Sequence, residues 1–160
     1  MDKHAGERDF DFLIGHWNVR HRRLKQRLRG SDSWEEFGGS VHAQPMLDGQ
    51  ANVDDNLLEL PSGDYRALSI RSFDRASGRW AIWWLDARSP HALEKPVLGR
   101  FTNGVGTFEA EDELDGRPIR VRFTWSDISP TSARWQQAFS ADAGVSWETN
   151  WVMDFERVHD

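Results

Sequence analysis

The sequence of 160 residues contains no cysteine. Disulfide bonds, thiolate catalysis and zinc–thiolate sites are therefore excluded. Long apolar runs are also missing, because no stretch approaches the roughly 18 apolar residues that a membrane span needs. The opening segment MDKHAGERDFDFLIG is charged throughout and has no apolar run of signal-peptide length. We therefore expect a cytoplasmic protein without a membrane partner.

The chain also lacks an excess of positive charge. Lys and Arg total 20 against 26 Asp and Glu, which gives a formal net charge of −6. Because affinity for phosphate backbones comes from Lys and Arg, we do not expect nucleic acid as a partner. The basic run RHRRLKQRLRG at 20–30 lies in a predicted strand and hairpin, so we interpret it as a solvated face. Its alternative role is to steer an anionic ligand.

Aromatic residues, by contrast, are abundant, with nine Trp and nine Phe beside a single Tyr. Most of the chain alternates apolar and polar residues with a period of two, as in IRVRFTWSDI at 119–128, and this pattern predicts β-strands. Asp115–Gly116 lies between two such runs and predicts a tight hairpin. The predicted strands lie at about 16–25, 33–43, 51–60, 65–73, 79–86, 97–102, 105–114, 117–128, 132–140 and 146–158.

About ten antiparallel strands joined by short turns must hide their edges. A closed up-and-down barrel does so and leaves room inside for a ligand. A β-sandwich is the alternative, but it usually needs longer crossing connections, of which the chain has few. We predict one all-β domain over residues 1–160, with its core at about 8–158. A short helical turn over DFDFLIG, ended by Gly15, is predicted to precede the first strand.

Both ends of the chain carry a family resemblance. Gly15-His16-Trp17 opens the first predicted strand, and Arg157 stands near the end of the last. With the surrounding runs FDFLIGHWNV and AFSADAGVSWETNWVMDFERV, they resemble a bacterial domain-of-unknown-function family of lipocalin-like proteins in the calycin superfamily. That family is similar in shape to nitrobindin and fatty-acid-binding-type barrels. The resemblance implies a barrel with a cavity, closed by Trp17 with Arg157 across its indole, and implies no agreed activity.

Nitrobindin-type proteins hold haem through a histidine in their late strands. Residues 92–158 of this chain contain no histidine. Haem binding is therefore the least favoured interpretation, and we predict no cofactor. No pair of histidines with a nearby carboxylate has a spacing that predicts a metal site.

Alternation along the predicted strands selects a set of inward residues. The stretch RWAIWW places Trp80 and Trp84 on one face and Trp83 on the other, so we expect Trp84 inside, beside Asp86, and Trp83 outside, under the N-terminal turn. Aromatic walls with a few polar groups are typical of a small-molecule pocket, although indoles also serve simply to fill a core. The predicted ligand-binding residues are Arg23, His42, Trp84, Asp86, Trp125, Trp135, Gln137 and Trp151.

Two residues are candidates for acid–base catalysis. His21 has inward parity, and the neighbouring Arg23 is expected to lower its pKa and keep it neutral. Asp54 and Asp55 stand in a predicted strand, where Asp is depleted, so one of them points inward and needs an arginine partner. We single out His21 and Asp55 as candidate catalytic residues. The alternatives are a hydrogen-bonded polar histidine near the mouth and solvated carboxylates at a strand end.

The leading functional hypothesis is binding of a small apolar or aromatic molecule inside the barrel. The alternative is a cofactor-free isomerase, lyase or cyclase that uses His21 or an Asp as acid or base on an aromatic or polyketide-like substrate. The fold alone does not choose between them. For the assembly, the sequence leaves a homodimer open.

Overall fold

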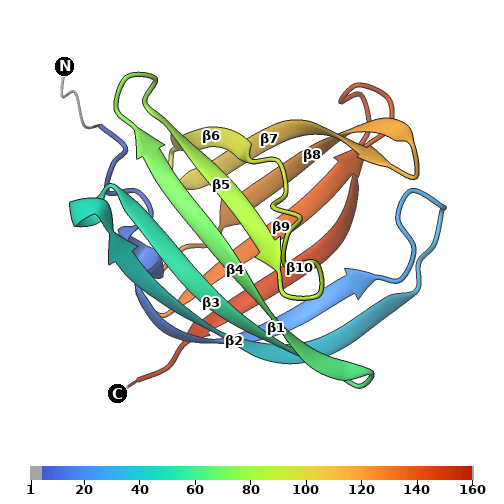
Figure 1. Cartoon of the computed structure of the whole chain (residues 1–160), viewed down its shortest axis with the longest axis horizontal. Coiled ribbons are helices and arrows are strands. Elements are labelled where there is room, and N and C mark those ends of the chain that lie inside the picture. Colours follow the sequence, from blue (N-terminus) through green and yellow to red (C-terminus); the bar gives the residue numbers. More distant parts are fainter. Residues whose placement is uncertain (1–4, 160) are drawn as a thin grey trace.

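The structure is a computed structural model that describes residues 5–159. Ten antiparallel strands form a closed barrel in which each strand pairs with its sequence neighbours and the last pairs with the first (Figure 1). The predicted all-β up-and-down barrel is confirmed. The strands are β1 (Gly15–Leu24), β2 (Trp34–Met46), β3 (Ala51–Leu60), β4 (Gly63–Asp74), β5 (Arg79–Asp86), β6 (Val97–Thr102), β7 (Val105–Leu114), β8 (Arg117–Ser126), β9 (Ser132–Ser140) and β10 (Glu148–Arg157).

The turn between β7 and β8 illustrates how local sequence sets the register. Asp115 and Gly116 both have positive φ, at 51° and 78°. Positive φ at both central residues is the geometry of a type I′ turn, whose twist matches that of the flanking strands. The predicted hairpin at Asp115–Gly116 is confirmed.

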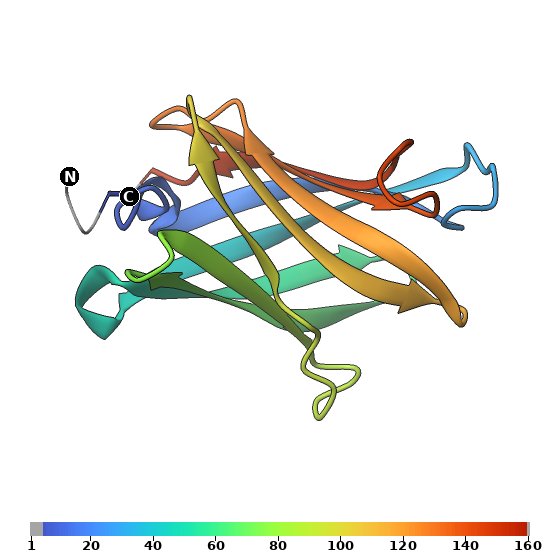
Figure 2. The same ribbon diagram turned by 90° about the horizontal axis from the view of Figure 1, so that it is seen from above.

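One end of the barrel is closed by Trp17 and Arg157. Trp17 is 1% exposed, and its indole N–H donates to the Leu13 carbonyl at 2.8 Å. The Arg157 guanidinium carbon lies 4.2 Å from the Trp17 ring centre, and the guanidinium donates to the carbonyl oxygens of Ile14 and Pro130. This contact, which the family resemblance implied, ties the N-terminal turn to the last strand. Both ends of the described chain lie on this side of the barrel (Figures 1 and 2).

The N-terminal turn η1 (Asp11–Leu13) plugs the same end from inside. The Phe10 ring, 1% exposed, packs 5.0 Å from Trp80 and 4.9 Å from Phe101. Trp80 donates to the Gly6 carbonyl at 3.0 Å. The prediction that Trp83 lies under this turn is therefore wrong, and Trp83 is half-buried on the outer face. The apolar turn buries Phe10 and its neighbours in the barrel interior instead of covering the wall.

The wall is incomplete where β5 and β6 separate. They share only three residue pairs, from Trp80–Gly99 to Ile82–Val97. Beyond Ile82, β5 pairs with β4 alone, while the chain leaves as the loop 87–96, which projects from the body (Figure 2). The loop returns so that the Glu94 N–H donates to the Trp84 carbonyl at 3.2 Å. The sheet is thus interrupted beside the end of β5, where the loop 87–96 lies.

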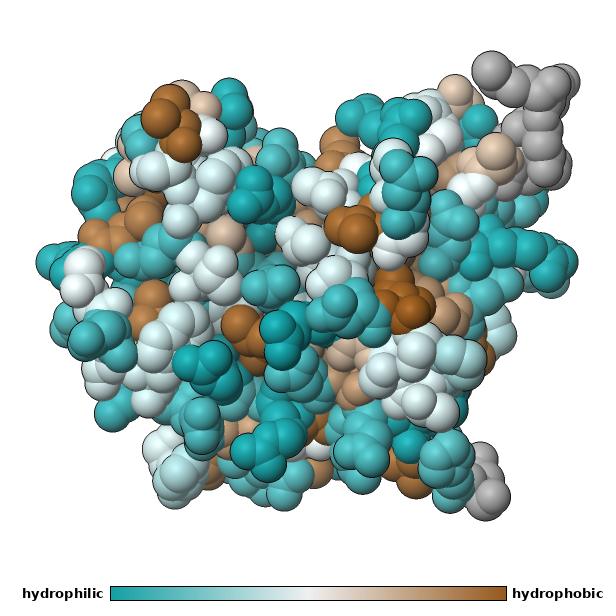
Figure 3. Space-filling view, turned by 180° about the vertical axis from the view of Figure 1, so that it is seen from behind, coloured by the Kyte–Doolittle hydropathy of each residue, from teal (hydrophilic) through white to brown (hydrophobic). Residues whose placement is uncertain are grey.

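The outer surface is mixed. Figure 3 shows apolar residues spread among polar ones on the back of the molecule. Across residues 5–159, no helix has the length and apolar composition required to cross a membrane.

Candidate functional site

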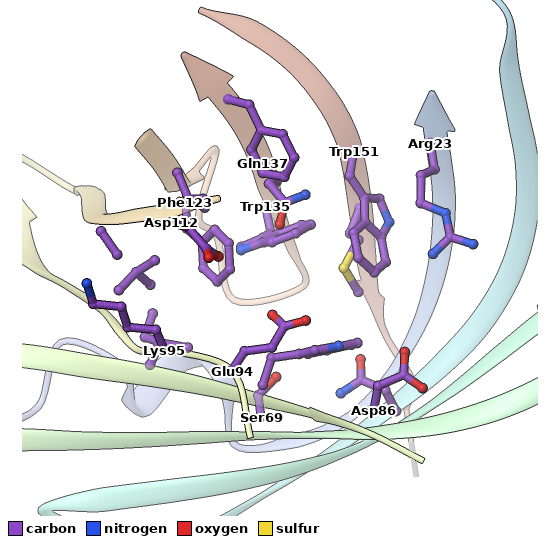
Figure 4. Close-up of a pocket in the computed structure, with 18 of the residues that line it drawn as sticks. Arg23, Ser69, Asp86, Glu94, Lys95, Asp112, Phe123, Trp135, Gln137 and Trp151 are labelled. Atoms are coloured by element: carbon purple, nitrogen blue, oxygen red, sulfur yellow. The ribbon is translucent and has the colours of Figure 1, made fainter. Parts of the chain in front are cut away.

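A cavity of about 270 Å³ lies inside the barrel, between its plugged end and the loop 87–96. Its walls come from strands on both sides of the barrel and from the loop 87–96 (Figure 4). Because inward residues alternate along each strand, the aromatic residues of β5, β8, β9 and β10 meet around one space. The aromatic residues that line it most prominently are Trp84, Phe123, Trp125, Trp135 and Trp151.

The indoles pack edge to face. Trp151 lies 5.8 Å from Trp84 at 84° and 5.3 Å from Trp135 at 88°, measured between ring centres and planes. Phe123 extends the series, 5.0 Å from Trp135 at 73°. The ring quadrupoles favour this arrangement, which holds the cavity wall in a defined shape.

Arg23, a positively charged residue of β1, lies on the wall of this cavity. It donates to Tyr65 Oη at 2.9 Å and, through two nitrogens, to Glu35 Oε1 at 3.2 Å. Its guanidinium carbon also lies 4.9 Å from the Trp151 ring centre and 5.0 Å from that of Phe37. The side chain is therefore fixed and its charge is balanced. Arg23 therefore places a polar group in a fixed position on the cavity wall, beside Trp151.

Charged residues of both signs line the cavity near the loop 87–96. Asp86 and Arg88 form an ion pair at 2.8 Å, and Glu94, Lys95 and Asp112 lie across from them (Figure 4). Burial by itself would raise the pKa of Asp86, but hydrogen bonds from the Arg88 side chain and backbone and the nearby Arg23 hold it below its ordinary value. Asp86 is therefore ionised at neutral pH, and this part of the cavity wall carries no strong excess of either charge.

A buried polar network crosses β3 and β4 on the inner face. Asp54, 2% exposed, pairs with Arg71 at 2.7 Å and accepts the Ser69 backbone N–H at 3.2 Å. Asn56 also donates to Asp54, and Arg71 donates to Asn52 Oδ1 at 3.0 Å. The prediction that one carboxylate of this strand points inward and pairs with an arginine is confirmed.

The inward carboxylate, however, is Asp54 and not Asp55. The inner face of β3 begins at Asn52, so the alternation sends Asp55 outward, where it pairs with the exposed Arg66 at 3.3 Å. Asp55 does not line the cavity. Its placement as an inward catalytic residue is wrong by one residue of register.

His21 is inside the barrel but does not line the cavity. Its Nδ1 accepts the Trp151 indole N–H at 3.0 Å, and its ring stacks on Phe37 at 4.5 Å. Burial, followed by the charge of Arg23, lowers the pKa of His21 to about 3. The expected direction of the pKa change is thus confirmed, with burial as the larger cause. The imidazole is neutral and orients Trp151.

The lowered pKa of His21 makes stability depend on pH. In the unfolded chain the imidazole takes up a proton below pH 6.5, whereas the folded protein stays neutral there down to about pH 3. Below pH 6.5, His21 should therefore lower the free energy of unfolding by about 1.4 kcal/mol for each unit by which the pH falls. His21→Gln still offers Trp151 an acceptor and cannot titrate. We expect urea unfolding to show that the drop in unfolding free energy from pH 7.5 to pH 4.5 is about 2–3 kcal/mol smaller in this variant than in the wild type.

The matched control is His91→Gln, because His91 is exposed in the loop 87–96. This variant should lose as much stability on acidification as the wild type. An equal pH dependence in His21→Gln and wild type would contradict a neutral, buried His21.

The structure brings most of the predicted ligand-binding residues to one cavity, and their role in binding stays a prediction. His42 is the exception. It lies on the outer face of β2, stacked on His16 at 3.9 Å, because Phe37 and Val41 take the inward positions of that strand. The large apolar side chains of Phe37 and Val41 were the sequence signal that this face of β2 points inward. The residues placed on the cavity wall are Arg23, Trp84, Asp86, Trp125, Trp135, Gln137 and Trp151.

Sequence reasoning also missed part of the site. Tyr65, Ser69 and Glu94 line the cavity and were not singled out. The inward parity of β4 would have revealed Tyr65 and Ser69, whereas Glu94 reaches the cavity from a loop, which periodicity does not describe. Within residues 5–159, no three His, Asp or Glu side chains are grouped so as to hold a metal ion.

No protein-family model and no curated protein matches the chain. Among solved structures, a redesigned β-barrel is similar with a TM-score of 0.53 at 10% identity, over 95% of this chain and 96% of that chain. The S-type phycobiliprotein lyase CPES from Guillardia theta follows at 0.49 and 8%, over 100% and 99%. A DUF3598-family protein of unknown function from Nostoc punctiforme gives 0.25 and 9%, over 96% and 99%. At such identities the likeness concerns the fold alone.

Proposed function

We propose that the barrel binds a small, largely aromatic molecule in its interior. The observation that carries this proposal is the cavity of about 270 Å³ bounded by Trp84, Trp135 and Trp151. Small-molecule pockets usually measure roughly 300–1,000 Å³, and an apolar cavity of about 150 Å³ holds benzene. The cavity therefore suits a molecule of one or two fused rings.

The polar groups on the wall support the same proposal. Arg23 and Gln137 are held by Glu35, Tyr65 and Asn150, so their positions do not depend on a ligand. A few fixed polar groups among apolar walls give orientation at low entropic cost. The resemblance of the chain ends to lipocalin-like proteins, which implies an interior cavity, agrees with this proposal, and membership of that family is part of it.

Binding is better supported than catalysis by the residues first considered. His21 is engaged with Trp151, and Asp55 faces solvent. Neither reaches the cavity, so neither is positioned to move a proton on a molecule held there.

The test is to fill the cavity. Ala110 lines it from β7, whereas Glu109 is exposed on the outer face of the same strand. Calorimetric titration with indane, a bicyclic hydrocarbon, is expected to show one molecule per chain with a negative heat-capacity change. Ala110→Phe should weaken binding at least about tenfold, because its ring occupies the space of the ligand.

Glu109→Phe is the matched control and should bind indane as the wild type does. Circular dichroism would verify that both variants keep the fold. If indane, naphthalene and indole all fail to bind the wild type, or if indane binds Ala110→Phe equally well, binding in this cavity is ruled out.

A further inference from the structure

Two buried hydrogen-bond donors on the cavity wall have no partner. Among the described residues 5–159, neither Arg71 Nε nor Trp125 Nε1 has a hydrogen-bond partner. Arg71 is 4% exposed and Trp125 is 1% exposed. An unmade hydrogen bond at a buried donor is costly, so native proteins rarely leave such groups unpaired. Two other buried atoms share this property, but Arg27 is only half-buried and Asn150 does not line the cavity.

The two donors belong to one place. The Arg71 guanidinium carbon lies 5.7 Å from the Trp125 ring centre and 5.4 Å from that of Phe10, the residue that plugs the barrel. Arg71 and Trp125 come from β4 and β8 and both line the cavity. They therefore meet at the inner end of the cavity, next to Phe10.

The two Arg71 Nη atoms and the Asp54 carboxylate at this end are already engaged. Arg71 gives one Nη to Asn52 and the other to Asp54. Asp54 accepts from Arg71, Asn56 and the Ser69 backbone. The carboxylate therefore has little capacity left to receive a donor from a ligand, whereas the Arg71 Nε–H and the indole N–H are both free to donate. The inner end of the cavity therefore has two unpaired donors, which a hydrogen-bond acceptor on a ligand would satisfy.

From this juxtaposition we infer that the inner end is a subsite for a carbonyl oxygen, and that the ligand is a small aromatic ketone, aldehyde, lactone or amide. The inference rests on the proposed ligand-binding function and specifies its ligand class. A carbonyl oxygen has two lone pairs and accepts from both donors. The rings of the ligand then lie against Trp84, Trp135 and Trp151.

A carboxylate is a poorer occupant than a carbonyl group. Arg71 and Asp54 already form a neutral pair at 2.7 Å, both almost fully buried. A second carboxylate would bring an uncompensated negative charge next to Asp54 in a region of low dielectric. A neutral acceptor satisfies the two donors without adding charge.

The experiment compares 1-indanone with indane, which has the same bicyclic framework but no carbonyl oxygen. In the wild type, calorimetry is expected to give a dissociation constant at least about tenfold lower for the ketone, from two additional hydrogen bonds. Trp125→Phe keeps a ring but removes the indole N–H. In this variant the ratio of the two dissociation constants should fall by about threefold or more, because only the ketone loses a hydrogen bond, whatever the loss of ring contact does to indane binding.

Trp135→Phe is the matched control, because it shortens another cavity indole, which packs against Phe123 and Trp151. Both ligands should bind it more weakly, and the preference for 1-indanone should persist. Should Trp125→Phe not fold, infrared spectroscopy on the wild type gives the answer. The C=O stretch of bound 1-indanone is expected at lower wavenumber than in hexane.

The outcomes separate the two proposals. Indane binding without preference for 1-indanone, or a hexane-like C=O stretch for the bound ketone, overturns the carbonyl subsite and leaves the binding function intact. If neither compound binds, the proposed function fails and the subsite with it. A 1-indanone preference that survives unchanged in a folded Trp125→Phe also overturns the subsite.

Discussion

Asp54→Ala is expected to lower the free energy of unfolding by about 3–5 kcal/mol. The substitution leaves the Arg71 guanidinium, only 4% exposed, without its counter-ion at 2.7 Å. It also removes the acceptor for the Ser69 backbone N–H. A buried charge without a partner retains its full desolvation penalty, which is why the loss exceeds that of an ordinary hydrogen bond. Urea unfolding followed by circular dichroism measures it.

The neighbouring residue supplies a close control. Asp55 stands on the same strand, but its pair with Arg66 is on the outer face with both side chains more than half exposed. Asp55→Ala should therefore cost no more than about 1 kcal/mol. The double variant Asp54→Ala/Arg71→Met should recover most of the stability lost by Asp54→Ala. Equal losses in Asp54→Ala and Asp55→Ala would contradict the register of β3.

Trp17→Ala is expected to destabilise the protein by about 3–5 kcal/mol. The indole is 1% exposed and receives the Arg157 guanidinium at 4.2 Å from its ring centre. Its removal leaves a cavity at the closed end and takes away the hydrogen bond to Leu13. Because the N-terminal turn depends on these contacts, the midpoint of urea unfolding should shift to a lower urea concentration. Far-ultraviolet circular dichroism measures this shift.

Trp34→Ala tests whether the loss is specific to the closed end. Trp34 begins β2, is half-buried, and contacts Arg22 at 4.9 Å on the outer face. Its removal should cost about 1 kcal/mol. A Trp17→Ala variant no less stable than Trp34→Ala would show that the Trp17–Arg157 contact does not hold the barrel shut.

The strand pattern could be predicted because each strand has one face toward the core. Seven-tenths or more of each predicted strand coincides with an observed one, and the largest difference is at the end of β2. The sequence suggests an end at Ala43, before Pro45, but the strand continues to Met46. Pairing with β1 stops at Ala43, so Pro45 pairs only with β3, and its missing N–H costs no ladder hydrogen bond on the free side.

The cavity wall could be predicted only in part. Trp125, Trp135 and Trp151 follow from parity, because one inward residue fixes every second residue along a regular strand. His42 and Asp55 were misplaced because both faces of β2 and β3 carry polar residues, so that the two registers look alike in the sequence. In such strands the pattern does not state which face is inner.

By itself, the amino-acid sequence determined the ten strands and their hairpin connections, because alternation and turn chemistry are local. The closing pair of Trp17 and Arg157 was expected from the family resemblance. Only the tertiary structure decided that Asp54 meets Arg71, that Phe10 plugs the interior, and that Trp125 and Arg71 present unpaired donors at one end of a cavity. Those relations depend on which strands face each other across the barrel. The arrangement of strands around the barrel is not encoded in any short stretch of the chain.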